Sequence, residues 1–151
     1  DYRYVLAAVV TAVIVFVVAF IFRESYRKSE KTVDEINNIF DALGLGVFTV
    51  MGANVAIESG FTVNGILVVC LAVVTGVGGG LIRDVMLMEI PFVLKKRIYA
   101  VASILGGTAY HLMYIHAVNI RLATVISVLI VFAVRILATV FKLDLPKVKL
   151  T

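Results

Sequence analysis

A run of glycines is the feature of this sequence that most directly suggests a chemical role. Four glycines fall within five positions, and an arginine and an aspartate follow, in the segment Gly76-Val77-Gly78-Gly79-Gly80-Leu81-Ile82-Arg83-Asp84. Each glycine costs roughly 1 kcal/mol relative to alanine inside a helix, so a helix through this run is expected to kink or open. Where a helix opens inside a membrane, its freed carbonyl and amide groups can line a path for an ion or a small polar substrate. The alternative is that the glycines only permit close packing between helices.

Polar residues within apolar stretches are further candidates for such a path. Four of these side chains could offer oxygen atoms to a cation, those of Thr75, Asn54, Thr49 and Asp41. Hydrogen bonding between helices is the commoner use of such side chains. Asp41 also suits the first turn of a helix, where the helix dipole favours a negative charge.

Three charged residues are candidates for a gate. Arg83 and Asp84 follow the glycine run and would flank the path on its cytoplasmic side, or they simply anchor the end of the helix at the membrane surface. Arg135 interrupts a long apolar run. It either extends its side chain to the nearer membrane surface or faces the interior and pairs with a carboxylate such as Asp84.

The basic cluster Lys95-Lys96-Arg97 is a candidate lipid-binding site. Attraction to anionic head groups is worth about 1 kcal/mol for each basic residue near the membrane surface, so an acidic phospholipid could bind there. The alternative is that the cluster only sets the orientation of the chain in the membrane.

Enzymatic and metal-dependent functions have no support in the sequence. It contains no acid–base pair, no nucleophile with an adjacent base and no zinc-binding spacing. Cys70 is the only cysteine, and His111 and His116 are five positions apart, which does not suit a shared helix face. The dinucleotide pattern G-x-G-x-x-G fails because Leu81 takes the place of its third glycine. We therefore expect no cofactor, no metal and no enzyme activity.

The composition indicates which elements position these residues. Of the 151 residues, 62% are hydrophobic and 16% are charged, against about 45–50% and roughly 25% in soluble domains. The mean hydropathy is +1.06. Uncharged stretches long enough to cross a bilayer occupy residues 4–22, 39–57, 61–82, 98–120 and 122–141. The sequence therefore predicts one all-α domain, a bundle of five membrane spans with the third span broken at the glycine run, and no nucleic-acid partner.

The basic residues predict the orientation of this bundle. Eleven of the fourteen Lys and Arg residues fall in the segment before the second span, in the segment between the third and fourth spans, and in the C-terminal tail. These segments lie on the same side of a five-span bundle. The positive-inside rule assigns that side to the cytoplasm, so we expect an inner-membrane protein with its N-terminus outside and its C-terminus inside.

Small residues predict which spans pack together. Pairs of small residues allow helix backbones to approach closely. The second span has the pairs Ala42-xxx-Gly46 and Gly52-xxx-Ala56, and the fourth has Gly106-Gly107. The first and last spans consist mainly of Val, Ile, Leu and Ala, which is typical of lipid-facing or peripheral helices. We expect the second, third and fourth spans to form the tightly packed core.

Three segments of the sequence resemble the prokaryotic branch of the trimeric intracellular cation (TRIC) channel family, which is also labelled a glycine-transporter-like domain family. They are Asp41–Gly46, Thr75–Asp84 and Glu89–Pro91. Members of this family look like seven-helix proteins, built from two three-helix repeats of inverted topology and a final helix. They form homotrimers with a cation pathway in each subunit. The resemblance implies potassium as the permeant ion and a homotrimer, and it places the kinked pore helix at Gly76, Gly78, Gly79 and Gly80, with Arg83 and Asp84 on its cytoplasmic flank.

The chain departs from the family pattern in length. Residues 4–22 look like the last helix of the first repeat, because Arg3–Ala7 is similar to Arg97–Val101 at the start of the fourth span. The next three spans look like the second repeat, and the last span looks like the final helix. Two helices of the first repeat are then missing, so we expect a fragment that carries one of the family's two glycine-broken helices. A phospholipid, known to bind some members, would fall to Lys95, Lys96 and Arg97.

Three functional hypotheses follow. The leading one is a passive monovalent-cation channel whose ion path follows the glycine-broken helix, because hydroxyl and carbonyl oxygens can bind a cation weakly enough to release it. The second is a secondary transporter of a small amino acid such as glycine, bound at half-helix ends. The third is a structural or lipid-binding membrane subunit. Ohmic potassium current supports the first and saturable glycine flux supports the second.

Overall fold

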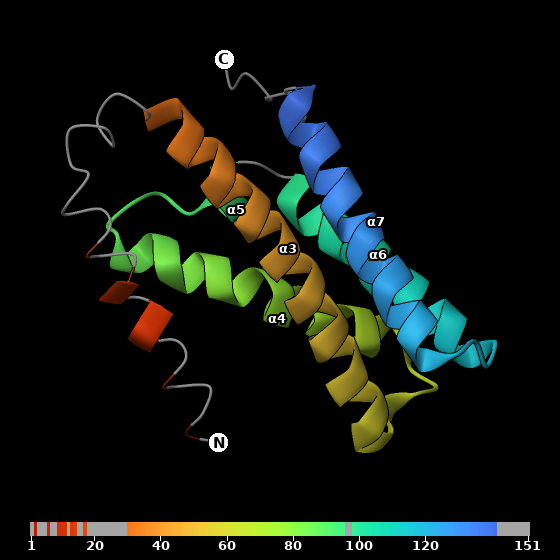
Figure 1. The fold of residues 1–151 in the computed structure, drawn as a ribbon. Helices are drawn as coiled ribbons and strands as arrows, with labels where there is room; N and C mark the ends of the chain where they lie inside the picture. Colours follow the sequence, from red (N-terminus) through yellow and green to blue (C-terminus); the bar gives the residue numbers. More distant parts are fainter. Residues whose placement is uncertain are drawn as a thin grey trace, which may run out of the picture. The chain divides into compact units, whose positions relative to one another are not determined.

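The computed structural model describes residues 30–95 and 98–141, together with residues 2, 6, 9–11, 13, 14 and 17; the side chains of residues 30–35, 92 and 95 are not described. The elements are α3 (Glu30–Ala56), the π-helical turn η1 (Ile57–Phe61), α4 (Gly65–Met86), α5 (Phe92–Lys95), α6 (Ile98–Ile115) and α7 (Ile120–Val140), as Figure 1 shows. The described residues contain helices and no strand. The chain divides into two compact units, Asp1–Asn38 and Ile39–Thr151, and the second carries the features that follow.

Four segments of the described chain are long and apolar enough to cross a membrane. They are Ile36–Phe61, Gly65–Met86, Ile98–Ile115 and Ile120–Val140. They correspond to four of the five predicted spans, so the all-α bundle of membrane helices is confirmed. The first predicted span, residues 4–22, falls mostly outside the described residues, and those of its residues that are described are helical.

Contacts between side chains define the directions of the helices. α6 runs parallel to α3, because Tyr99 contacts Asp41 at one end and Tyr110 contacts Asn54 at the other. α4 runs antiparallel to α3, since Arg83 reaches Asp41 from the end of α4. α7 packs beside α6 along its length (Figure 1), in the opposite direction. Below, the Asp41 end and the Glu58 end denote the two ends of this bundle.

The predicted break in the third span is wrong, because α4 is a continuous helix through the glycine run. Two of its glycines are packed against neighbouring helices. A Cβ atom at Gly76 would overlap the hydroxyl of Thr49 on α3 and lie 3.0 Å from Oγ of Ser103 on α6. A Cβ atom at Gly80 would overlap the hydroxyl of Tyr99. Close packing on both sides therefore offsets the poor helix propensity of glycine, which local sequence reasoning cannot weigh.

The irregular backbone lies at the helix ends instead. At η1 the chain leaves the helical path at Gly60, whose φ is 89°, a value that favours glycine. α4 then starts at the cap Asn64, whose side chain accepts a hydrogen bond from the Leu67 amide at 3.1 Å. Together these residues allow the chain to reverse direction between α3 and α4.

Helix α7 belongs to the packed core, contrary to the expectation of a lipid-facing last span. A Cβ atom at Gly46 of α3 would lie 3.1 Å from the carbonyl oxygen of Val128, and one at Gly106 of α6 would overlap a methyl group of Val131. Val131 is fully buried. The predicted small-residue positions Gly46 and Gly106 thus do mediate close packing, but their partner is α7.

Candidate functional site

Four charged side chains and a tyrosine form a compact cluster at the Asp41 end. Arg83 Nη1 donates to Asp41 Oδ1 at 2.9 Å, and Arg83 Nη2 donates to Asp84 Oδ1 at 2.8 Å. The carboxylate side chains of Asp41 and Asp84 are 8% and 3% exposed, whereas the Arg83 side chain is 41% exposed. The partly exposed Arg83 side chain therefore pairs with two buried carboxylates. We call Asp41, Arg83, Asp84, Tyr99 and Arg135 the charge cluster.

Arg135 enters this cluster from α7. Its side chain is 3% exposed, and Nη2 lies 3.4 Å from Asp41 Oδ2. Its guanidinium carbon is 4.7 Å from the centre of the Tyr99 ring, a cation–π contact. The Tyr99 hydroxyl donates to Asp41 Oδ1 at 3.2 Å. Of the two interpretations of Arg135, the inward-facing one is confirmed, and Asp41 is a carboxylate that it pairs with.

The charges of this cluster balance one another. Two arginines face two aspartates, so the formal charge is zero, inside helices that are apolar enough to span a membrane. Removing one partner from a buried ion pair typically costs about 3–5 kcal/mol, because the remaining charge stays desolvated. The first-turn interpretation of Asp41 is wrong, since α3 begins at Glu30 and Asp41 lies well inside the helix.

The glycine run connects this cluster to an exposed face of α4. Thr75, Gly79 and Arg83 are spaced four residues apart, so they share one face of the helix, and none of the three is buried. The nearest atoms to a Cβ at Gly79 would belong to the Phe48 ring, at 3.8 Å, and Gly78 has nothing within 4 Å. We call this strip of α4 the glycine face. It leaves helix backbone accessible next to Arg83.

Two further polar contacts join α3 to α6. Thr49 Oγ1 and Ser103 Oγ are 2.6 Å apart and both residues are fully buried. Toward the Glu58 end, the Tyr110 hydroxyl donates to Asn54 Oδ1 at 3.0 Å, and Asn54 Nδ2 donates to Glu58 Oε1 at 2.7 Å. Asn54 thus hydrogen-bonds between helices, the commoner use that the sequence suggested for it.

The structure joins some of the predicted site residues and separates others. Hydrogen bonds connect four of them in the charge cluster, namely Asp41, Arg83, Asp84 and Arg135. Asn54 lies toward the opposite end of α3. The predicted lipid-binding residues lie outside what the structure describes, which includes neither Lys96 and Arg97 nor the side chain of Lys95. Sequence reasoning missed the α6 residues that contact α3. Their spacing was a usable signal, since Tyr99, Ser103 and Tyr110 recur at helical intervals on one face.

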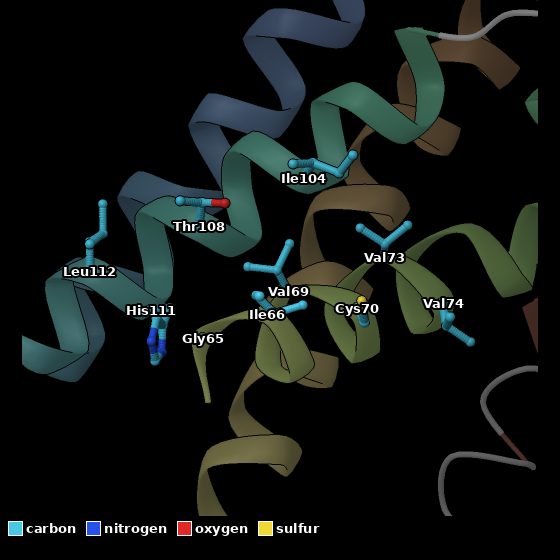
Figure 2. Close-up of a pocket in the computed structure, with 10 residues that line it drawn as sticks. All are labelled: Gly65, Ile66, Val69, Cys70, Val73, Val74, Ile104, Thr108, His111 and Leu112. Atoms are coloured by element: carbon cyan, nitrogen blue, oxygen red, sulfur yellow. The ribbon is translucent and has the colours of Figure 1, made fainter. Parts of the chain in front are cut away.

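A separate apolar groove lies between α4 and α6. It has a volume of about 710 Å³, and Figure 2 shows its lining side chains, which come from both helices. Val69, Cys70 and Val73 line it from α4, and Thr108 and His111 are its polar members. None of the charge-cluster residues lines this groove, so the groove is not part of the candidate site. Within the described segments no group of three or more His, Cys, Asp or Glu residues could hold a metal ion.

The fold and its charge cluster define a class, that of polytopic helical membrane proteins with buried charges inside their spans. Comparison with known proteins narrows this class. Residues 38–115 match the family model described as "Glycine transporter". The inner membrane protein YadS of Escherichia coli K12, named as a UPF0126 protein, is 39% identical over 112 residues, which cover 72% of this chain and 52% of that protein.

Two solved structures share the fold. One, from a study of conductance through TRIC cation channels, has a TM-score of 0.75 and 33% identity and covers 94% of this chain and 67% of the other. The second is the TRIC trimeric intracellular cation channel orthologue from Rhodobacter sphaeroides, with a TM-score of 0.78, 29% identity and coverage of 95% and 69%. The chain belongs to the TRIC family, and it spans about half the length of the curated relatives it matches. The expectation that it is not an enzyme agrees with this family.

Proposed function

We propose that this chain supplies one wall of the pathway of a monovalent-cation channel, with potassium as the permeant ion. The observation that carries the proposal is the glycine face of α4, which ends at Arg83 of the charge cluster. Exposed glycines leave room for an ion to pass near the helix backbone, and Thr75 adds a hydroxyl oxygen on the same face. Such neutral oxygens bind a cation weakly enough to release it, which conduction requires.

The charge cluster is the gate in this proposal. Arg83 is the member that links the glycine face of α4 to buried Asp41 on α3. With its guanidinium held by Asp41 and Asp84, the Arg83 side chain stands at the end of the path and obstructs it. Movement of α4 relative to α3 breaks these two contacts and clears the path. Arg135 keeps Asp41 in place when Arg83 leaves, because it bonds the other carboxylate oxygen.

The assembly and location of the protein are part of the same proposal. Helix α4 would line one side of the cation pathway, so the pathway needs a second lining. We expect it to come from the part that full-length relatives have beyond the matched segment. The solved relatives are named as TRIC channels and one as a trimeric channel, which supports a homotrimer. YadS is named as an inner membrane protein, which supports that membrane. We retain the orientation with the Asp41 end in the cytoplasm, and the binding of an acidic lipid to Lys95, Lys96 and Arg97.

The transporter hypothesis is not favoured. It required half-helix ends at a break in the glycine run, where the carboxylate and ammonium groups of glycine would bind. Because α4 is continuous from Gly65 to Met86, these half-helix ends are absent from that position. A saturable glycine flux remains the result that would revive it.

Flux in liposomes tests the proposal. Potassium and labelled glycine are followed side by side, for this chain and for a form extended to the length of its relatives. The extended form is expected to pass potassium without saturable glycine uptake. Gly79→Leu fills the glycine face and should abolish potassium flux, while Ala133→Leu, on an exposed position of α7, should leave it intact. Unchanged flux in the Gly79 variant, with normal insertion, would show that α4 is not a wall of the path.

A further inference from the structure

The acidic residues of the described spans differ in how their charges are balanced. Asp41 and Asp84 both pair with arginines in the charge cluster. Glu58 has no ion-pair partner among the residues described. Only its Oε1 atom accepts a hydrogen bond, from Asn54 Nδ2 at 2.7 Å, and Oε2 has no partner in that part of the chain. The cluster at the Asp41 end is thus neutral, whereas Glu58 at the other end forms no ion pair with Arg121 of α7 or with any other described residue.

Glu58 lies where the C-terminal ends of two helices add negative potential of their own. It lies in η1, which directly continues α3, and its side chain is exposed. The C-terminal end of a helix carries a partial negative charge, and neither η1 nor the parallel helix α6 has a basic residue in its last turn. A carboxylate in this place is unfavourable unless a cation lies nearby. An ionisable residue without an ion-pair partner inside a membrane-spanning segment is for this reason a candidate functional group.

Neighbouring side chains hold the carboxylate in position. The Tyr110 hydroxyl, on a residue that is 1% exposed, donates to Asn54 Oδ1 at 3.0 Å. With its oxygen occupied, the Asn54 amide presents Nδ2 to Glu58. This chain of two hydrogen bonds runs from the buried face of α6 to the surface of η1. It orders one carboxylate oxygen and leaves the other available to a ligand.

We propose that Glu58 is the site at which a hydrated monovalent cation first binds at the Glu58 end of the bundle. The proposal rests on the proposed cation conduction and names the group that recruits the ion at this end. Ca²⁺ prefers six to eight oxygen ligands, and a single carboxylate does not provide them, so the site does not suit Ca²⁺. A monovalent cation that binds here keeps most of its water. Weak binding with rapid release is what conduction requires of an entry site.

Chemical modification tests binding without relying on conduction. A carbodiimide with an amine nucleophile is applied to the reconstituted protein in KCl or in N-methylglucamine chloride at equal ionic strength, and mass spectrometry measures the modified fraction of each carboxylate. Potassium is expected to slow modification of Glu58 at least twofold and to leave Glu89, an exposed residue after α4, unchanged. Equal modification of Glu58 in the two salts overturns the proposal.

Conductance supplies the second test. In the extended form, Glu58→Gln is expected to lower potassium current entering from the Glu58 end about twofold in roughly 10 mM salt, and to have no effect in about 1 M salt, where screening removes the field of the charge. Glu58→Asp should retain the current, and Glu89→Gln serves as the matched control. An equal current for Glu58→Gln and wild type in low salt overturns the entry site. If the wild-type form passes no potassium, the proposed function fails, and the modification experiment still decides whether Glu58 binds a cation.

Discussion

Replacing Arg83 with glutamine tests whether the charge cluster is a gate. Arg83→Gln removes the contacts to Asp41 Oδ1 at 2.9 Å and Asp84 Oδ1 at 2.8 Å. Because the arginine side chain is 41% exposed, each contact is worth no more than about 1 kcal/mol. Loss of both therefore weakens the closed state by about 0.4–2 kcal/mol, which raises the ratio of open to closed channels by about 2- to 30-fold.

The assay compares open probability in planar bilayers for wild type and Arg83→Gln. Arg121→Gln is the matched control, because Arg121 is an exposed arginine at the opposite end of the bundle. We expect a higher open probability for Arg83→Gln alone, with unfolding in mixed micelles shifted by no more than about 2 kcal/mol. Arg135 limits the loss of stability, since it still pairs with Asp41.

An open probability that stays the same or falls would refute this reasoning. It would mean that the contacts of Arg83 are equally strong in the open and closed states, in which case they hold α3 and α4 together without controlling the path. Equal gains for Arg83→Gln and Arg121→Gln would also count against the gate, because a general change in surface charge would then explain the effect.

Two further predictions concern stability. Arg135→Met should destabilise the fold by about 3–5 kcal/mol, because it breaks an ion pair whose two side chains are only 3% and 8% exposed. Adding Asp41→Asn should recover part of the loss. Unfolding in mixed micelles measures both effects, and strictly additive effects would contradict the pairing. Gly76→Ala should destabilise by about 1–3 kcal/mol because its methyl group overlaps the Thr49 hydroxyl, whereas Gly78→Ala should stabilise by about 0.5–1 kcal/mol because its position is open. Equal effects of the two alanines in the same unfolding experiment would show that packing does not distinguish these glycines.

The extent of the spans could be predicted from the sequence because it depends on composition along the chain. Uncharged stretches of about 20 residues must be helical in a bilayer, where backbone groups have to bond to one another. The predicted span at residues 122–141 thus agrees closely with α7, which covers Ile120–Val140. The span predicted at 98–120 extends too far, because α6 ends at Ile115 and a turn follows in which Ala117 adopts a φ of 55°. Hydropathy does not register such a turn between apolar residues.

The sequence also marked the charges that matter without revealing their partners. Arg135 stood out because a charge within an apolar span requires an explanation. Its pairing with Asp41 joins residues 94 positions apart, and Tyr99 enters the same cluster from a third helix. Such pairings depend on how helices are placed around one another, which no local pattern records.

The glycine run shows most clearly what the sequence determined and what only the tertiary structure decided. Composition alone established a membrane protein of several helices and drew attention to Gly76–Gly80. Whether those glycines break α4 or allow neighbouring helices to pack closely against it depends on the side chains that face each glycine. Thr49 and Ser103 occupy the space beside Gly76 and Tyr99 the space beside Gly80, so helix packing outweighs the low propensity of glycine and α4 stays continuous.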